Sequence, residues 1–271
     1  MMNGQQCYII FSDLDGTLLN HDSYSWEEAR PALAVIRERG IPLVLCSSKT
    51  KSEIEQYRLR LRNEHPFISE NGGGIFIPIG YRGFRLQYDL IQEGYWVICL
   101  SVGYPSLVKA LGEIKEKTGL KIKGFSDMND KEVAMATGLG LEEARLAKKR
   151  QFDEPFLVEG ETDGLREAIK AMGLECTEGG RFFHLMGNID KGKATRRLAD
   201  MYRENCPDFN IVTVGIGDSL NDLPMLEAVD IAILVKGPYG GYDHRVVVKD
   251  LIRTEDIGPK GWNDAVLRLI T

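Results

Sequence analysis

Compact apolar runs that alternate with amphipathic stretches dominate both ends of the chain. Residues 7–11 and 41–46 are short, rich in aliphatic side chains and bounded by polar residues, so they are predicted to be buried strands. Apolar residues at helical spacing follow the first run until Gly40, and a charged helical segment occupies residues 51–63. This order of strand, helix, strand and helix is typical of a parallel sheet with right-handed crossovers.

The start of the first helix is predicted at Ser25 and Glu28, which have the spacing of a capping box. The same alternation of elements returns in the C-terminal third of the chain. A helix, two strands and a final helix are expected there at residues 193–204, 211–217, 231–235 and 262–269. Both ends of the chain are therefore predicted to contribute to one sheet.

The middle of the chain mixes short strands and helices without a regular alternation. Strands are expected at residues 95–100, 120–123, 154–158 and 181–186, and helices at 105–118, 132–135, 141–149 and 165–172. Such a pattern predicts an α+β module with an antiparallel sheet. The predicted architecture is α/β: a Rossmann-like doubly wound parallel sheet, built from residues 1–84 and 187–271, with residues 85–186 as an inserted α+β cap domain. Residues 81–84 and 187–189 are the expected hinges because the pattern changes there.

Composition limits the classes of partner. The formal net charge of -6 argues against nucleic acid as the main partner, while a local basic site for a small phosphorylated substrate is compatible with it. No apolar run approaches the ~20 residues that span a bilayer, so no membrane partner is expected. The N-terminus lacks the features of a signal peptide, and the five cysteines are scattered. These features favour reduced thiols and a cytoplasmic location.

Two carboxylates stand where the first predicted strand ends. Asp13 and Asp15 follow the run at residues 7–11, and Gly16 allows a sharp turn directly after them. Open parallel sheets bind their ligands at this edge. One carboxylate is suited to hold a divalent metal and attack phosphorus, and the other to exchange protons with the leaving group and with water. The pair therefore predicts phosphoryl transfer, with a solvated turn without chemistry as the alternative.

Four motifs in a fixed order resemble those of the haloacid dehalogenase superfamily of phosphatases. They are Asp13-Leu14-Asp15-Gly16-Thr17, Ser47 after the second strand, Lys191 at a helix start, and Asp218 with Asn221 and Asp222 after a late strand. The resemblance implies that Asp13 is the nucleophile, that Asp15 is the general acid and base, and that Ser47 and Lys191 stabilise the transferring phosphoryl group. It also implies a Mg²⁺ site formed by Asp13, the backbone carbonyl of Asp15, Asp218 and Asp222, an oxygen-rich set that suits this ion.

Segments in and beside the expected cap domain are similar to the mannosyl-3-phosphoglycerate phosphatase family. They lie at residues 45–50, 68–74, 124–128, 137–139, 147–150, 154–156 and 181–187. A departure from many sugar phosphatases of the superfamily is Ser48-Lys49, where those enzymes have Gly-Arg. The phosphate- and substrate-binding residues expected on this basis are Ser48, Lys49, Asn71, Gly72, Arg150, Glu154 and Asn221.

Within that set, Arg150 is expected to bind the carboxylate of the substrate and Glu154 to accept hydrogen bonds from sugar hydroxyls. The glycine-rich turn that begins at Gly72 is expected to let the backbone pass close to a ligand, or to form a tight hairpin. For each of these residues a surface ion pair or a turn is the alternative.

The function implied by the resemblance is Mg²⁺-dependent hydrolysis of the phosphate monoester of mannosyl-3-phosphoglycerate, which gives mannosylglycerate through an aspartyl-phosphate intermediate. The expected partner is this small phosphorylated sugar-glycerate, bound by a monomer or homodimer. The alternatives are glucosyl-3-phosphoglycerate or another sugar phosphate as substrate, phosphoryl transfer to a sugar, and a non-catalytic sugar-phosphate sensor. A sensor has no need for both a nucleophile and an acid, so the presence of Asp13 and Asp15 argues against it.

Overall fold

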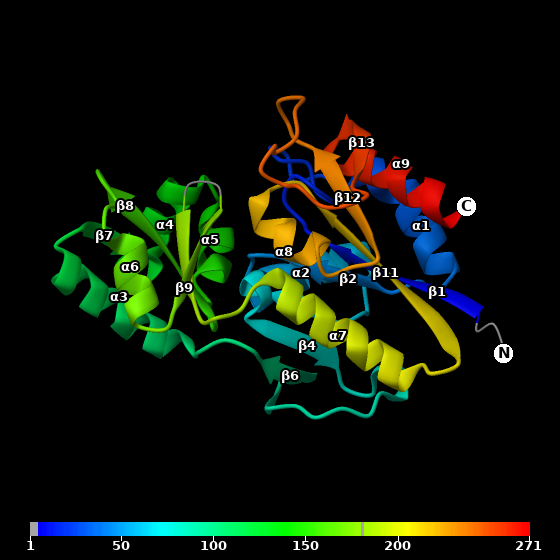
Figure 1. The fold of residues 1–271 in the computed structure, drawn as a ribbon, viewed down its shortest axis with the longest axis horizontal. Helices are drawn as coiled ribbons and strands as arrows, with labels where there is room; N and C mark the ends of the chain where they lie inside the picture. Colours follow the sequence, from blue (N-terminus) through cyan, green and yellow to red (C-terminus); the bar gives the residue numbers. More distant parts are fainter. Residues whose placement is uncertain (1–4, 180–181) are drawn as a thin grey trace.

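The computed structural model describes residues 5–179 and 182–271, which form two lobes around two sheets (Figure 1). The large sheet has nine strands in the order β13-β12-β11-β1-β2-β3-β4-β6-β5. The small sheet has four strands in the order β7-β8-β10-β9. Across the described residues, no helix is long and apolar enough to cross a membrane.

Parallel strands form the centre of the large sheet. β1 (Gln5–Ser12) lies between β11 (Phe209–Gly217) and β2 (Leu43–Cys46), and it is parallel to both. β12 (Ile231–Lys236) and β13 (Ile252–Ile257) continue the parallel order on one side, although β13 was not expected from the sequence. The two ends of the chain thus share one sheet, as predicted.

Helices cover both faces of the large sheet. Ile10 of β1 packs in a core with α1 (Arg30–Glu38), α2 (Lys51–Leu61) and α9 (Gly258–Ile270). Ile9 and Phe11 point to the opposite face, because side chains alternate along a strand. There they pack against α7 (Lys191–Asn205) and α8 (Leu223–Leu226). The predicted α/β class with a doubly wound sheet is therefore confirmed.

The capping box predicted at Ser25 is wrong. A 3-10 turn, η1 (Glu27–Ala29), precedes α1, so Ala29 rather than Ser25 is the residue before the helix. Ser25 Oγ accepts a hydrogen bond from the N–H of Glu27, at 3.3 Å. A proline in the first turn of α1 lacks the N–H that a cap would satisfy.

An antiparallel extension follows the parallel strands of the large sheet. β3 (Phe67–Ser69) is parallel to β2, and the turn η2 (Glu70–Gly72) then reverses the chain. The antiparallel strands are β4 (Gly74–Pro78), β5 (Leu90–Gln92) and β6 (Tyr95–Cys99), with η3 (Tyr81–Gly83) between β4 and β5.

The predicted inserted module began at residue 85, but β5 and β6 belong to the large sheet. β6 hydrogen-bonds to β4 along that sheet. The role of residues 81–84 as a hinge stays a prediction. The Tyr81 hydroxyl is 2.8 Å from that of Tyr202 on α7, so this segment packs on the large sheet's own helix. We propose that the cap covers residues 101–186, and the name cap is used for these residues below.

The cap is an antiparallel sheet with helices on both faces. Its strands are β7 (Lys121–Gly124), β8 (Asp153–Glu159), β9 (Glu175–Gly179) and β10 (Phe182–Met186). α3 (Tyr104–Thr118) and α6 (Leu165–Ala171) share one hydrophobic core, whereas α4 (Asp130–Thr137), α5 (Leu141–Ala147) and the turn η4 (Phe125–Asp127) share the other. The α+β prediction is confirmed, β9 was missed, and Arg181, the predicted first residue of the last strand, lies outside the described residues.

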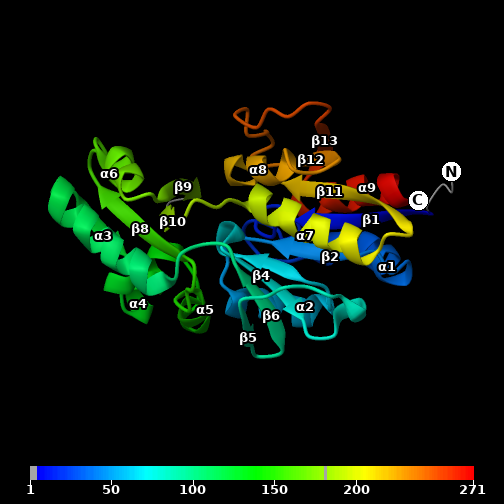
Figure 2. The same ribbon diagram turned by 60° about the horizontal axis from the view of Figure 1, so that its bottom comes forward.

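Two neighbouring connections join the lobes (Figure 2). Ser101 lies on the first and Gly187 on the second, and the Gly187 N–H donates to Ser101 Oγ at 2.9 Å. Ser101 Oγ in turn donates to the backbone oxygen of Phe152 in the cap, at 3.2 Å. The two connections between the lobes are therefore hydrogen-bonded to each other.

Candidate active site

The acidic residues predicted from the sequence meet at the carboxyl ends of β1 and β11. Asp13 follows β1, and its N–H donates to the carbonyl of Ile216 on the adjacent β11 at 2.9 Å. One carboxylate oxygen from each of Asp13, Asp218 and Asp222 lies within 4.8 Å of the others. Parallel neighbouring strands end at the same edge, which explains why residues so far apart in sequence form one cluster.

Lys191 provides the positive charge beneath this cluster. Its Nζ lies 2.7 Å from Asp13 Oδ1 and 2.6 Å from Asp222 Oδ1, and its side chain is fully buried. Asp222 is also fully buried, and its second oxygen accepts the N–H groups of Asp218 and Ser219 at 3.0 and 3.2 Å. Both oxygens of Asp222 are thus engaged within the protein, which favours a supporting position beside a metal over direct ligation.

Burial and mutual repulsion dominate the electrostatics of the cluster. Burial raises the pKa of Asp13 from 3.8 to about 7, with Lys191 acting in the opposite direction and Asp222 adding to the rise. The pKa of Asp218 is raised well above its ordinary value by burial and by the charges of Asp222 and Asp13. Three carboxylates around one ammonium leave negative charge uncompensated, and the donors are all oxygens, so the residues fit a divalent cation such as Mg²⁺.

Asp15 is paired with Lys49, which was expected to bind phosphate or substrate. Lys49 Nζ lies 2.8 Å from Asp15 Oδ2. The ammonium is buried between the rings of Tyr24 and Tyr57, 5.2 and 5.7 Å from their centroids. Asp15 Oδ1 has no hydrogen-bond partner in the described part of the chain. Lys49 thus holds one oxygen of Asp15, and the other oxygen is left without a partner among the described residues.

Gly16 is required by close approach as well as by backbone conformation. Its φ is +78°, and a Cβ at this position would lie 2.7 Å from Asp218 Oδ2. Thr17, the next residue, donates from Oγ1 to Asp218 Oδ1 at 3.2 Å. The turn after Asp15 therefore holds the carboxylate of Asp218 in place.

Ser47 is buried at the end of β2, and its backbone carbonyl accepts the N–H of Asn71 at 3.0 Å. Its hydroxyl accepts the N–H of Lys49 at 3.3 Å. Ser48, in contrast, lines the cavity described below. Ser47 is not among the residues that line this cavity, and its predicted contact with a phosphoryl group stays a prediction.

Other parts of the protein pack closely against the glycine-rich turn at residues 72–74. Gly72 has a φ of +104°, and a Cβ there would lie 2.4 Å from the carbonyl oxygen of Asp190. A Cβ on Gly73 would lie 2.3 Å from that of Phe152 in the cap. Asn71 donates its amide to Asp153 Oδ2 at 3.1 Å. Protein atoms thus pack closely against this turn, and its predicted contact with a ligand stays a prediction.

A cavity of about 660 Å³ lies between the acidic cluster and the cap. Its walls on the side of the large sheet include Asp13, Asp15, Ser48, Lys49, Asp218 and Asn221. Its walls on the cap side include Phe125, Leu139, Phe182 and His184. A cavity of this volume has room for a ligand larger than phosphate, with charged groups at one end and mainly apolar groups at the other.

Arg150 and Glu154, which the resemblance placed at the substrate, are not among the residues that line this cavity. Arg150 donates to the carbonyl of Ser48 at 2.8 Å, and its Nε has no partner among the described residues. Glu154 is fully buried and accepts from the Tyr104 hydroxyl at 2.7 Å and from Ser126 Oγ at 2.6 Å. Their observed contacts lie within the protein, and their contact with substrate stays a prediction.

Two further buried residues were missed by the sequence analysis as parts of the site. Glu70 accepts the N–H groups of Gln151 and Phe152, so that it ties the large sheet to the cap. His184 lines the cavity and lies 2.9 Å from Asp153. Glu70 and His184 lie within two segments that carry the family resemblance, residues 68–74 and 181–187, but the resemblance did not single out either residue.

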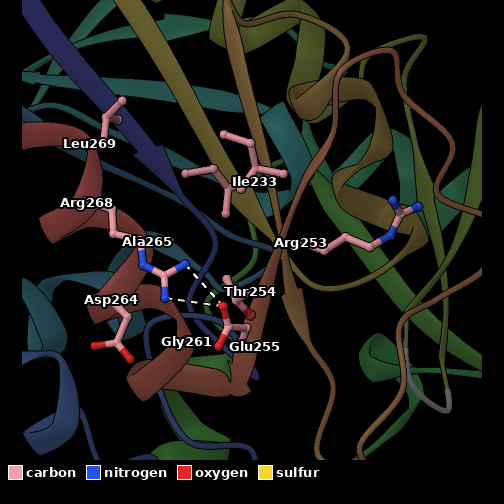
Figure 3. Close-up of a pocket in the computed structure, with 10 residues that line it drawn as sticks. Ile233, Arg253, Thr254, Glu255, Gly261, Asp264, Ala265, Arg268 and Leu269 are labelled. Atoms are coloured by element: carbon pink, nitrogen blue, oxygen red, sulfur yellow. Dashed lines mark hydrogen bonds and ion pairs between the residues drawn. The ribbon is translucent and has the colours of Figure 1, made fainter.

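A second cavity, of about 220 Å³, lies between β13 and α9 (Figure 3). Arg268 and Glu255 both line it and form an ion pair, with 3.3 Å between Nη2 and Oε1. It contains no member of the acidic cluster, so the cavity beside Asp13 is the candidate active site.

Comparison with known proteins agrees with this choice. A family described as haloacid dehalogenase-like hydrolase matches residues 10–83. A glucosyl-3-phosphoglycerate/mannosyl-3-phosphoglycerate phosphatase from Methanococcoides burtonii is 48% identical over 267 residues, which cover 97% of each chain. An enzyme with the same name from Persephonella marina is 44% identical over 265 residues, again 97% of each chain.

A solved structure supports the fold. A phosphatase of the haloalkanoate superfamily from Bacteroides thetaiotaomicron matches with a TM-score of 0.66 at 16% identity, over 97% of this chain and 95% of that one. Near-complete coverage shows that the large sheet and the cap occur together in both proteins. The chain therefore belongs to the glucosyl-3-phosphoglycerate/mannosyl-3-phosphoglycerate phosphatases, a family of phosphoric monoester hydrolases within the haloacid dehalogenase-like hydrolases.

Proposed function

We propose that the protein hydrolyses the phosphate monoester of glucosyl-3-phosphoglycerate and mannosyl-3-phosphoglycerate, with Asp13 as nucleophile. The observation that carries the proposal is the position of Asp13, which lines the cavity while Lys191 holds its Oδ1 at 2.7 Å. This contact fixes the carboxylate and leaves Oδ2 for attack. The names of the relatives support the two substrates.

In the first step, the Asp13 carboxylate attacks phosphorus, and the bond from phosphorus to the glycerate oxygen breaks. Asp15 donates a proton to the departing oxygen. In the second step Asp15 takes a proton from a water molecule that attacks the aspartyl-phosphate, which releases phosphate and restores Asp13. The contact of Lys49 with Asp15 Oδ2, at 2.8 Å, orients the carboxylate for both transfers.

Asp13, the Asp15 backbone carbonyl and Asp218 are the residues that would hold Mg²⁺, with Asp222 as their support. The ion would supply charge neutralisation at the transferring oxygens. Lys191 supplies further positive charge from below the cluster, a preorganised arrangement of the kind that stabilises charge in phosphoryl transfer.

The proposal is tested by phosphate release from the glucosyl and mannosyl compounds and from a panel of simple sugar phosphates, with Mg²⁺ or with chelator. We expect Mg²⁺-dependent release from the two phosphoglycerate compounds and loss of at least about 100-fold in kcat in Asp13→Asn. Asp22→Asn, an exposed carboxylate nearby in sequence, is the matched control.

Release from simple sugar phosphates at equal rates would keep the mechanism but overturn the substrate. Retained activity in Asp13→Asn would overturn the nucleophile. Binding without release from any compound would favour the sugar-phosphate sensor, and phosphate transfer to an added sugar would favour a phosphotransferase.

A further inference from the structure

His184 is an ionisable side chain on the cap wall of the active-site cavity. It lies on β10, its side chain is 9% exposed, and it lines the cavity with Phe125, Leu139 and Phe182. Of the described residues on this wall, His184 alone is ionisable. The opposite wall carries the acidic cluster and Lys49, whose ammonium is already paired with Asp15.

Asp153 fixes the orientation of the His184 ring. The Asp153 side chain is fully buried, and its two oxygens lie 2.9 and 3.1 Å from Nδ1 of His184. Burial acts to raise the pKa of Asp153, but His184, Arg150 and the Asn71 amide outweigh it and lower the pKa below 3.8. An ionised carboxylate only accepts hydrogen bonds, so the proton between the two residues is on Nδ1. Nε2 has no hydrogen-bond partner among the described residues and is left for the cavity.

Asn71 links the Asp153–His184 pair to Ser47 at the end of β2. It donates its amide to Asp153 at 3.1 Å, and its backbone N–H donates to the carbonyl of Ser47 at 3.0 Å. A single residue of the large sheet therefore sets the position of the Asp153–His184 pair relative to the end of β2.

The proposed substrates carry a second anionic group besides phosphate, the glycerate carboxylate. A carboxylate that enters a cavity away from water needs a donor, preferably a charged one. Arg150, the donor expected from the sequence, points its Nη1 to the carbonyl of Ser48 and does not line the cavity. The free Nε2 of His184 lies on a wall that otherwise offers mainly apolar contacts.

We propose that His184 binds the carboxylate of the glycerate unit through Nε2–H, with Asp153 as the positioning residue behind it. In this arrangement both ring nitrogens donate, Nδ1–H to Asp153 and Nε2–H to the carboxylate of the substrate. This inference rests on the proposed function and names the residue that selects a phosphoglycerate over a simple sugar phosphate.

The test compares glucosyl-3-phosphoglycerate with its carboxamide analogue, in which a neutral amide replaces the carboxylate. We expect the wild-type protein to prefer the carboxylate by about 10- to 100-fold in kcat/KM, the range for one charge-assisted hydrogen bond. His184→Gln should remove most of this preference through KM while leaving kcat/KM for the carboxamide within about threefold. Asp153→Asn should lower the preference in the same direction.

His244→Gln is the matched control, because His244 is exposed and does not line the cavity. Equal loss on both compounds in His184→Gln, or an unchanged preference, would overturn the role of His184 while phosphate release by the wild type still supports the proposed function. Release from neither compound by the wild type would overturn the proposed function and the role of His184 with it.

Discussion

The Nζ of Lys191 lies 2.6 Å from Oδ1 of Asp222, and neither side chain is exposed to solvent. The pair joins the first residue of α7 to the turn after β11. Since the same ammonium also contacts Asp13, three segments of the chain depend on one charge. A buried pair of this kind is costly to break because its partners are left uncompensated.

Lys191→Ala is expected to lower both stability and turnover. The loss of the ammonium leaves Asp13 and Asp222 facing each other, and breaking a buried pair costs about 3–5 kcal/mol. We expect kcat to fall by about 100-fold or more. Denaturant unfolding and steady-state kinetics measure the two effects. Lys193→Ala, with a partly exposed side chain on the same helix, should change neither, and a similar loss in both variants would contradict the assignment.

The stabilisation that Mg²⁺ provides should grow with pH. Burial raises the pKa of Asp13 from 3.8 to about 7, so between these values the folded protein holds a proton that the unfolded chain has lost. The metal-free protein therefore loses stability as pH rises through this window. We expect the increase in Tm on replacing chelator by Mg²⁺ to be larger at pH 8 than at pH 5. Asp218→Asn should reduce the increase at pH 8, and an increase that is equal at both pH values would refute the prediction.

Gly72→Ala should be more destabilising than Gly80→Ala. Both glycines have positive φ, +104° and +78°, so either alanine adopts an unfavourable backbone conformation at a cost of about 1–2 kcal/mol. At Gly72 the new Cβ also meets the carbonyl of Asp190 at 2.4 Å, whereas at Gly80 no other part of the described chain lies within 4 Å. The additional cost is expected to be about 1–3 kcal/mol. Equal free energies of unfolding for the two variants would show that the turn can move away.

Glu70→Gln should flatten the decline of stability with pH. Burial raises the pKa of Glu70 from 4.5 to about 8, with Arg150 acting in the opposite direction. A raised carboxyl pKa means that stability is lost as pH rises from about 4.5 to 8. The glutamine lacks this titration and keeps an oxygen for the Phe152 N–H. We expect the Tm of the variant relative to the wild type to increase from pH 5 to pH 8, while exposed Glu64→Gln shows no such trend.

The parts of the fold and site that depend on local pattern were predictable. The apolar run before Asp13 and the run before Asp218 identified two strands, and parallel pairing then brings their ends together. Lys191 was identified by its motif, and its contact with Asp13 follows from the position of α7 over the same edge. The strands need only the periodicity of the chain and the geometry of a parallel sheet, whereas Lys191 needed the resemblance to a known family.

The rest depends on contacts that a local pattern does not encode. The sequence of residues 95–99 predicts the strand β6, but it does not indicate whether this strand pairs with β4 or with a strand of the cap. The sequence predicts that Glu154 accepts hydrogen bonds from substrate. In the structure its buried carboxylate accepts them from the Tyr104 and Ser126 hydroxyls instead. The orientation of the His184 ring depends on Asp153, which contacts it from a neighbouring antiparallel strand.

The pairing of β1 with β11 also has a consequence for the order of folding. The register joins residues 5–12 to residues 209–216, so the contacts that assemble the acidic cluster have high sequence separation. The cap sheet needs only residues 121–186, which are synthesised before β11. Contacts of high sequence separation form slowly because loop closure costs entropy. A nascent chain can thus carry a structured cap while Asp13 still lacks the neighbours that make its carboxylate reactive.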